Sequence, residues 1–309
     1  MIVNQDINRF SHMQQGCVAT IGKFDGVHLG HQLILDQLKQ KAEQLNLPAL
    51  VILIEPHPEE FFTAPGEDCP ARLTVLMEKL ELLESFGIDC VYQLNFDKAL
   101  SQVSAEDYIQ NILVEGLGLA SLIVGNDFRF GHNRQGDYEL LQTRGIENSF
   151  EVIETSTYER NGQRISSTFI RGQLARGDFK LVEQLLGRPY SMKGEVVRGQ
   201  QLGTDLGYPT CNVNLHRRRI PLHGVYACEV RINGDLQRAA VNIGYRPSLS
   251  DDGEALLEAH LLDFEKDLYG RSIEVIFRHR IREEIKFDSL DELTKQIELD
   301  VEKVRVLFA

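Results

Sequence analysis

Residues 17–31 of this 309-residue chain, CVATIGKFDGVHLGH, decide the fold of its first half. Residues 17–21 form a short apolar run that ends at Gly22, as expected of a buried strand. A glycine-rich turn follows, and apolar residues then recur at helical spacing until Pro48. A strand, a glycine-rich turn and a helix in this order indicate the first unit of an α/β sheet.

The same alternation continues along the first half of the chain. Residues 49–54, ALVILI, are continuously apolar, which is typical of a strand covered on both faces of a parallel sheet. Further strands are expected at 90–94, 122–124 and 151–153, and helices at 73–86 and 105–113. This pattern predicts a doubly wound α/β domain.

The pattern changes near residues 187–189, after which short β-rich runs dominate. These runs cover 224–232, 237–243, 256–264 and 273–279, with turn residues between them. The chain ends in an amphipathic helix that a Ser289-x-x-Glu292 capping box opens. We therefore expect two domains, 1–186 and 187–309, the second an antiparallel barrel or sandwich with a docked helix.

The composition and charge of the chain argue against several classes of protein. The 33 Lys and Arg residues against 46 Asp and Glu give a net charge of −13, whereas nucleic-acid binding needs an excess of basic residues. Most of the deficit lies in residues 1–186, which carry 15 basic and 26 acidic groups. No apolar run reaches the ~20 residues of a membrane span, and the N-terminus lacks the features of a signal peptide. Five scattered cysteines fit reduced thiols, so we expect a cytoplasmic protein that binds neither nucleic acid nor a membrane.

Residues 22–31 lie at the carboxyl end of the first predicted strand and at the start of a helix, where open α/β sheets bind ligands. His28 and His31 are three residues apart and share one helix face, and the free amides of a helix start favour an anion. Two imidazoles with Gly30 between them suit a polyphosphate whose charge rises during transfer. A metal site with His57 as third ligand, or histidines that only cap and pack, are the alternatives, and we favour phosphate binding.

Three further clusters follow expected strands or open an expected helix. They are Glu55-Pro56-His57-Pro58, residues 125–131 (GNDFRFG) and residues 165–171 (ISSTFIR). The second offers aromatic and charged groups for a planar ring, and the third offers hydroxyls and an arginine for phosphate. Each alone also fits a turn, a surface loop or a helix cap, but together they predict a ligand site at one sheet edge.

In the second half, residues 194–212 contain a glycine-rich loop that could wrap phosphates. Thr210 and Asn212 are two apart, so on an extended segment they point the same way. Their oxygens suit Mg²⁺ bound together with nucleotide phosphates. A series of glycine-rich β-turns explains the loop equally well.

Glu258 falls in the predicted strand 256–264, where an inward-facing charge would cost stability unless it were used. It is therefore a candidate general base for a substrate hydroxyl. Residues 217–219, three consecutive arginines, are interpreted as a solvated basic turn. An RNA-contact role for that turn is the alternative, and the near-neutral charge of the second half disfavours it.

Taken in order, these motifs resemble those of the prokaryotic bifunctional riboflavin kinase/FAD synthetases, from about residue 16 to the C-terminus. GKFDGVHLGH carries the H-x-G-H signature of nucleotidyltransferases, and ISSTFIR carries their second signature. YPTCN, GVYA, VNIGYRPS and HLLDFEKDLYG resemble the kinase module. The resemblance implies a nucleotidyltransferase-type, Rossmann-like first domain and a six-stranded barrel. It also implies that ATP converts riboflavin to FMN, and FMN to FAD with release of pyrophosphate.

The resemblance further implies roles for individual residues. His28 and His31 would bind the ATP phosphates, Glu258 would activate the riboflavin 5′-hydroxyl, and Thr210 with Asn212 would hold Mg²⁺. The other nucleotide contacts would be Gly22, Phe24, Asp25, Gly30, Ser166, Ser167, Thr168 and Arg171 in the first domain, and Gly199, Gly203 and Gly207 in the second. The flavin neighbours would be His57, Phe62, Asp127, Phe128 and Phe130.

The glycine-rich loop within residues 194–212 departs from the pattern of the kinase module, because Leu202 and Thr204 stand where arginines are common. An FMN adenylyltransferase with a weakened or inactive kinase-like barrel is therefore the alternative. The expected partners are small molecules only, namely ATP, riboflavin and FMN. The sequence leaves open the oligomeric state, the slower of the two reactions and whether FMN passes directly between the modules.

Overall fold

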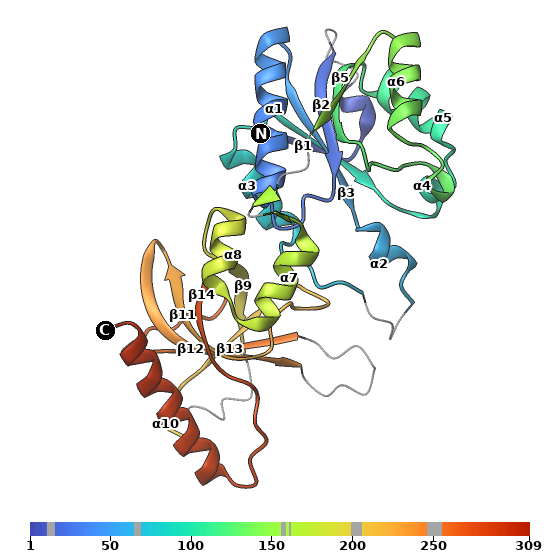
Figure 1. Cartoon of the computed structure of the whole chain (residues 1–309). Helices are drawn as coiled ribbons and strands as arrows, with labels where there is room; N and C mark the ends of the chain where they lie inside the picture. Colours follow the sequence, from blue (N-terminus) through green and yellow to red (C-terminus); the bar gives the residue numbers. More distant parts are fainter. Residues whose placement is uncertain (11–15, 65–68, 156–158, 161, 199–205, 246–254) are drawn as a thin grey trace. The chain divides into compact units, whose positions relative to one another are not determined.

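The computed structural model describes all residues except 11–15, 65–68, 156–158, 161, 199–205 and 246–254. The chain divides into two compact units, whose elements Figure 1 labels. The first unit comprises Met1–Ala64 and Leu76–Ser166, and the second comprises Pro65–Val75 and Ser167–Ala309. The second unit therefore contains residues 167–186, which the sequence analysis assigned to the first domain.

The first unit is built on a six-stranded sheet in the order β1-β4-β3-β2-β5-β6, and every neighbouring pair is parallel. The strands are β1 (Ile2–Asn4), β2 (Cys17–Gly22), β3 (Ala49–Glu55), β4 (Cys90–Asn95), β5 (Leu119–Gly125) and β6 (Glu151–Thr155). The predicted α/β sheet is confirmed. Only β1, a three-residue strand at the sheet edge, has no counterpart among the predicted strands.

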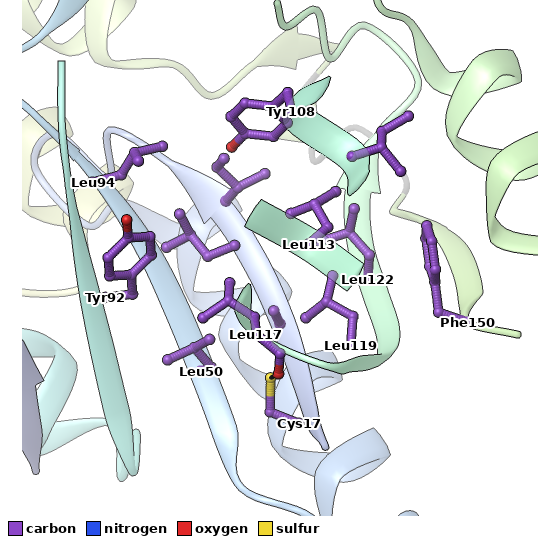
Figure 2. Packing of buried hydrophobic residues seen from close by; sticks show 14 of the residues in the cluster. Cys17, Leu50, Tyr92, Leu94, Tyr108, Leu113, Leu117, Leu119, Leu122 and Phe150 are labelled. Carbon is purple, nitrogen blue, oxygen red and sulfur yellow. Dashed lines mark hydrogen bonds between the residues drawn. The ribbon is translucent and has the colours of Figure 1, made fainter. Parts of the chain in front are cut away.

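Alternate residues of the strands enter two different hydrophobic layers. Cys17 and Ala19 lie in the layer that Figure 2 shows, together with side chains of α5 (Ala105–Asp107), the π-helix η2 (Tyr108–Gly116) and α6 (Tyr138–Glu147). Val18 packs in the opposite layer with α1 (Leu29–Leu45) and α3 (Leu76–Ser85). Helices on both faces make the sheet doubly wound, as predicted. The short elements are η1 (Ile7–Arg9), α2 (Pro58–Phe62), α4 (Lys98–Ser101), η3 (His132–Arg134), β7 (Glu159–Arg160) and β8 (Gln163–Arg164).

Two predicted helices differ from the structure. The one expected at 105–113 is a short α-helix that continues as a π-helix. The one expected at 73–86 begins only at Leu76. The Leu73 carbonyl instead accepts hydrogen bonds from the Tyr190 hydroxyl at 3.2 Å and from Arg217 at 3.1 Å, both in the second unit.

The second unit contains a closed antiparallel barrel in the order β10-β13-β12-β11-β14-β9. Its strands are β9 (Ser191–Val197), β10 (Cys211–Asn214), β11 (Gly224–Ile232), β12 (Asp235–Tyr245), β13 (Ala255–Leu261) and β14 (Ser272–Arg282). The predicted six-stranded barrel is confirmed. The sequence analysis did not predict β9 or β10.

Three helices accompany the barrel: α7 (Ser167–Arg176), α8 (Phe179–Leu186) and α10 (Leu290–Leu307). The Phe179 ring meets the rings of Tyr226 and Phe277 at centroid distances of 5.7 and 6.1 Å, so α8 belongs to the barrel unit. Helix α10 begins after Ser289, whose side chain accepts from the Glu292 amide as the capping box predicts. Its Val304 packs against the barrel, which confirms the docked helix.

Arg217 is not part of a solvated turn, and that expectation is wrong. Its side chain is buried and donates to the carbonyls of Arg72 at 2.8 Å and Leu73 at 3.1 Å. Arg171 donates to the carbonyl of Ala71 at 2.5 Å. Buried carbonyls need donors, and these two arginines supply them to the segment before α3.

Burial raises the pKa values of several cysteine thiols. The pKa of Cys17 rises to about 12, and those of Cys90 and Cys211 rise to about 11. These thiols therefore stay protonated at neutral pH and are poor nucleophiles. In the described part of the chain, no helix is long and apolar enough to cross a membrane.

The buried ion pair between Arg282 and Asp300 joins α10 to β14, with Nη2 of the arginine 2.7 Å from the carboxylate. Replacing Asp300 by alanine leaves a largely buried guanidinium without this partner, and we expect it to cost about 3 kcal/mol of stability. Urea unfolding, followed by circular dichroism, measures the loss. The exposed pair Arg305–Asp263 provides the control, since Arg305→Ala should change the unfolding midpoint little. Equal midpoint shifts for the two variants would contradict the assignment.

Candidate active sites

His28 begins helix α1. It is the N-cap residue, and its Nδ1 accepts a hydrogen bond from the backbone amide of His31 at 3.2 Å. An N-cap side chain satisfies one of the amides that a helix start leaves without an intrahelical partner. Because Nδ1 is the acceptor, the proton of a neutral His28 lies on Nε2. The cap therefore sets both the start of the helix and the tautomer of the imidazole.

The loop from β2 to α1 has an unusual backbone. Phe24 has a φ of 47° and Val27 a φ of 39°, a left-handed conformation that is rare for a bulky or β-branched residue. Both side chains are buried, and the side-chain Nε2 of Gln32 donates to the Val27 carbonyl at 2.9 Å. Packing and this hydrogen bond hold the strained loop in one shape. Strain of this kind concentrates at functional sites.

The two imidazoles stack. The ring centroids of His28 and His31 are 3.7 Å apart with an interplanar angle of 12°, and the Phe24 ring lies 5.0 Å from His31. A Cβ on Gly30 would come within 3.2 Å of the His28 ring. Glycine at position 30 thus leaves the space that the His28 ring occupies, which gives the H-x-G-H pattern a steric reason.

His31 is held neutral. Burial lowers its pKa well below the usual 6.5, and the nearby His28, Lys79 and Lys23 lower it further. Its Nδ1 is buried and has no hydrogen-bond partner in the described part of the chain. The first turn of α1 therefore presents the His28 imidazole and a neutral His31 beside the amides of a helix start, an arrangement suited to an anion.

Lys79, which the sequence analysis missed, belongs to α3, and its side chain reaches the end of β3. Its side chain is fully buried and contacts the Glu55 carboxylate, with Nε2 of His57 at 2.9 Å and the carbonyl of Lys23 at 3.1 Å. Position 79 is three residues from Leu76 and four from Leu83, so it occupies the apolar face of α3. This spacing is the feature of the sequence from which the burial of Lys79 could have been predicted. His57 faces an ammonium ion, which opposes the alternative in which it ligates a metal.

The other predicted flavin neighbours lie in two places. Phe62 is exposed and packs edge-on against Phe61 and Phe96, at centroid distances of 5.1 and 5.7 Å. Phe128 stacks on the buried Phe130 at 5.5 Å. The Asp127 carboxylate pairs with Arg164 at 2.6 Å. Their contact with a flavin stays a prediction.

The predicted nucleotide residues near position 168 fall on both sides of the division between units. Ser166 closes the first unit, whereas Ser167, Thr168 and Arg171 belong to α7 in the second. Gly22 ends β2, Phe24 and Asp25 lie in the loop after it, and Asp25 is buried. The roles of these residues stay predictions.

On the barrel, the strand register brings the predicted kinase residues together. Asn212 on β10 pairs directly with Glu258 on β13, and Glu258 pairs on its other side with Asn242 on β12. Directly paired residues share a face of a sheet. Glu258 is half-exposed between the buried Leu257 and Ala259, so the expected inward position is wrong. The pleat places it with Asn212 and Asn242 on the opposite face.

Thr210 precedes β10 in a segment that β13 holds in place. The carbonyl of Pro209 accepts a hydrogen bond from Nδ1 of His260 at 2.9 Å, and the Tyr208 ring meets the His260 ring edge-on at 5.5 Å. Gly207 has a φ of 83°, a conformation that favours glycine. Gly199 and Gly203, predicted to bind phosphate, lie outside the described residues, as do Leu202 and Thr204.

The described residues contain no group of three or more His, Cys, Asp or Glu side chains that could hold a metal ion. A metal at the barrel site would therefore need hydroxyl and amide oxygens, or oxygens of a substrate. Asn242 Oδ1 is buried without a hydrogen-bond partner in the described structure and belongs to the same cross-strand row as Asn212 and Glu258. This donor set fits a hard cation bound together with phosphate oxygens.

A parallel α/β unit whose helix start suits an anion, in one chain with a barrel that carries an oxygen-rich row, is typical of a nucleotide-dependent transferase of two domains. Residues 10–169 match the family model for FAD synthetase, and residues 186–308 match the model for riboflavin kinase. The chain belongs to the family of bifunctional riboflavin kinase/FMN adenylyltransferases.

Individual relatives agree with this family. The chain is 48% identical to the bifunctional riboflavin kinase/FMN adenylyltransferase of Pseudomonas fluorescens, over 96% of this chain and 94% of the relative. It is 46% identical to the enzyme of the same description from Escherichia coli K12, with the same coverage. A crystal structure described as a macrolide-efflux protein from Streptococcus pneumoniae has a TM-score of 0.80 and 29% identity, over 98% of both chains.

The environment of His31 predicts an imidazole that stays neutral well below pH 6.5. Histidine-selective NMR titration, assigned with a His31→Gln variant, should show this resonance moving only at acidic pH. Because the folded state resists protonation of His31, its contribution to stability is present above pH 6.5 and is lost as the pH falls through the lowered pKa. A titration centred near 6.5 would contradict the structure.

Proposed function

We propose that the two ATP-dependent activities of this family, riboflavin phosphorylation and FMN adenylylation, reside at the two sites described above. The observation that carries the proposal is the separation of the two sets of groups. The stacked pair of His28 and His31 lies in the first unit, whereas the row containing Asn212 and Glu258 lies in the second. The alternative with an inactive barrel is not favoured, because the riboflavin kinase model matches residues 186–308.

In adenylyl transfer, a phosphate oxygen of FMN attacks the α-phosphorus of ATP, and the bond to pyrophosphate breaks. Negative charge builds on the transferring phosphoryl group and on the leaving pyrophosphate. His28 donates from Nε2, because its Nδ1 accepts from the His31 amide. His31 binds as a neutral donor beside it. Preorganised donors of this kind stabilise a transition state whose charge exceeds that of the substrate.

In phosphoryl transfer, Glu258 takes the proton of the riboflavin 5′-hydroxyl, and that oxygen attacks the γ-phosphorus of ATP while ADP leaves. Phosphoryl transfer depends mainly on positioning and on charge stabilisation. Mg²⁺ supplies that charge stabilisation when it is bound with ATP. Thr210 and Asn212 would hold it, and the buried Oδ1 of Asn242 in the same row supports this oxygen-rich assignment.

We further assign residues 1–186 to FMN adenylylation and 187–309 to riboflavin phosphorylation. Residues 22–25 and 166–171 would complete the nucleotide site of the first activity, and the loop ending at Gly207 would complete that of the second. Phe62 and Phe128 would contact the flavin. The substrates are small molecules, and we place the enzyme in the cytoplasm.

Replacing His28 tests the adenylylation site. His28→Asn keeps an N-cap acceptor but removes the imidazole, so the helix should persist. We expect FAD formation from FMN and ATP to fall about 100-fold or more, while FMN formation from riboflavin stays unchanged. Separation of the flavins by chromatography gives both rates from one sample. Leu33→Ala, on an exposed part of the same helix, is the control. Undiminished FAD formation in His28→Asn would refute the proposed site.

Replacing Asn212 tests the proposed cation. Asn212→Ala should raise the Mg²⁺ concentration needed for half-maximal riboflavin phosphorylation by roughly tenfold or more. The Mg²⁺ dependence of FAD formation should not change. Asn214→Ala, an exposed asparagine on the same strand, is the matched control. An unaltered Mg²⁺ dependence in Asn212→Ala would rule out its role as a ligand.

A further inference from the structure

Lys79 is a completely buried lysine in the first unit, at 0% exposure. Lysine is almost never fully buried unless it is paired, because removal of an ammonium ion from water costs free energy that only close acceptors offset. The residue belongs to α3, outside the motifs that define the family signatures of this chain. Its burial therefore calls for a function that an ordinary helix residue does not have.

Acceptors from the ends of two strands face the ammonium group. They include the carboxylate of Glu55, Nε2 of His57 at 2.9 Å and the backbone carbonyl of Lys23 at 3.1 Å. An ammonium ion can only donate hydrogen bonds, so contacts of this kind offset the cost of its burial.

Those strands, β2 and β3, are parallel neighbours, with Gly22 paired to Leu53. Lys23 opens the loop that leads from β2 to His28, and Glu55 is the last residue of β3. Lys79 therefore joins the two connections that leave the carboxyl edge of the sheet at this point. It does so from α3, which packs on the sheet through Leu83.

We propose that Lys79 is a positioning residue for adenylyl transfer, which fixes the loop of residues 22–31 to the turn of residues 55–57 and so sets the place of the His28–His31 pair. This inference rests on the proposed function of that pair. Lys79 is fully buried, so it acts through the loop rather than by contact with a substrate.

One consequence for a neighbouring histidine follows from the same contacts. Burial is the main reason that the pKa of His31 is low, and the charges of His28, Lys79 and Lys23 lower it further. Lys79 thus favours the neutral state of a histidine that it does not contact.

The test uses a double variant, Lys79→Met/Glu55→Gln, which removes the cation without leaving a buried carboxylate unpaired. We expect kcat for FAD formation to fall roughly 10- to 100-fold, with riboflavin phosphorylation by the same sample unchanged. The NMR titration of His31 should move toward higher pH, because a nearby positive charge is removed. A lysine that only stabilised the fold would lower the unfolding midpoint but leave kcat of the folded enzyme unchanged. Lys41→Met/Glu151→Gln, which removes a more exposed lysine–glutamate pair of the same unit, should change none of these quantities.

Three outcomes would overturn the inference: FAD formation within twofold of the original, an unchanged His31 titration, or an equal loss of both activities. The His28→Asn variant, assayed in parallel, separates this inference from the proposed function. If His28→Asn loses FAD formation and the Lys79 variant retains it, only the role of Lys79 is wrong. If His28→Asn also retains FAD formation, the proposed phosphate site itself is wrong.

Discussion

The hydrogen bond from the His31 amide to Nδ1 of His28 is the contact on which the proposed adenylylation site depends. It begins α1, sets the tautomer of a neutral His28 and brings the two rings within stacking distance. The strained loop before it is held by buried Phe24 and Val27, and Gly30 leaves room for the His28 ring. One local interaction therefore gives the end of a buried strand a preorganised geometry that suits an anion.

In the barrel, strand pairing rather than a helix cap positions the residues of the proposed site. The register aligns Asn212, Glu258 and Asn242 across three strands. Polyphosphate binding at the two proposed sites needs no excess of basic residues in the whole chain. Amides, imidazoles and a few local cations would act at short range, whereas the surface carboxylates of a chain with charge −13 are screened by salt.

Sequence periodicity predicted the elements with strong patterns, namely the buried strands β2 and β3, the barrel strand β11 and the capped helix α10. It failed where local pattern carries little information. Strand β1 is three residues long and partly exposed, and β10 follows a glycine-rich loop. Arg217 was predicted to be a solvated cation and Lys79 was not singled out, because their buried acceptors are distant in sequence. The face of Glu258 depends on the pleat of a strand whose neighbours only the closed barrel defines.

The central claim is that the two activities use separate sites in separate units, and a mixing experiment tests it most directly. His28→Asn should stop at FMN when given riboflavin and ATP, and Glu258→Gln should make FAD only when FMN is added. An equimolar mixture of the two inactive variants should then convert riboflavin to FAD through free FMN. If Glu258→Gln cannot adenylylate added FMN, or if the mixture makes no FAD while each variant retains its own reaction, the two sites are not independent and the account is contradicted.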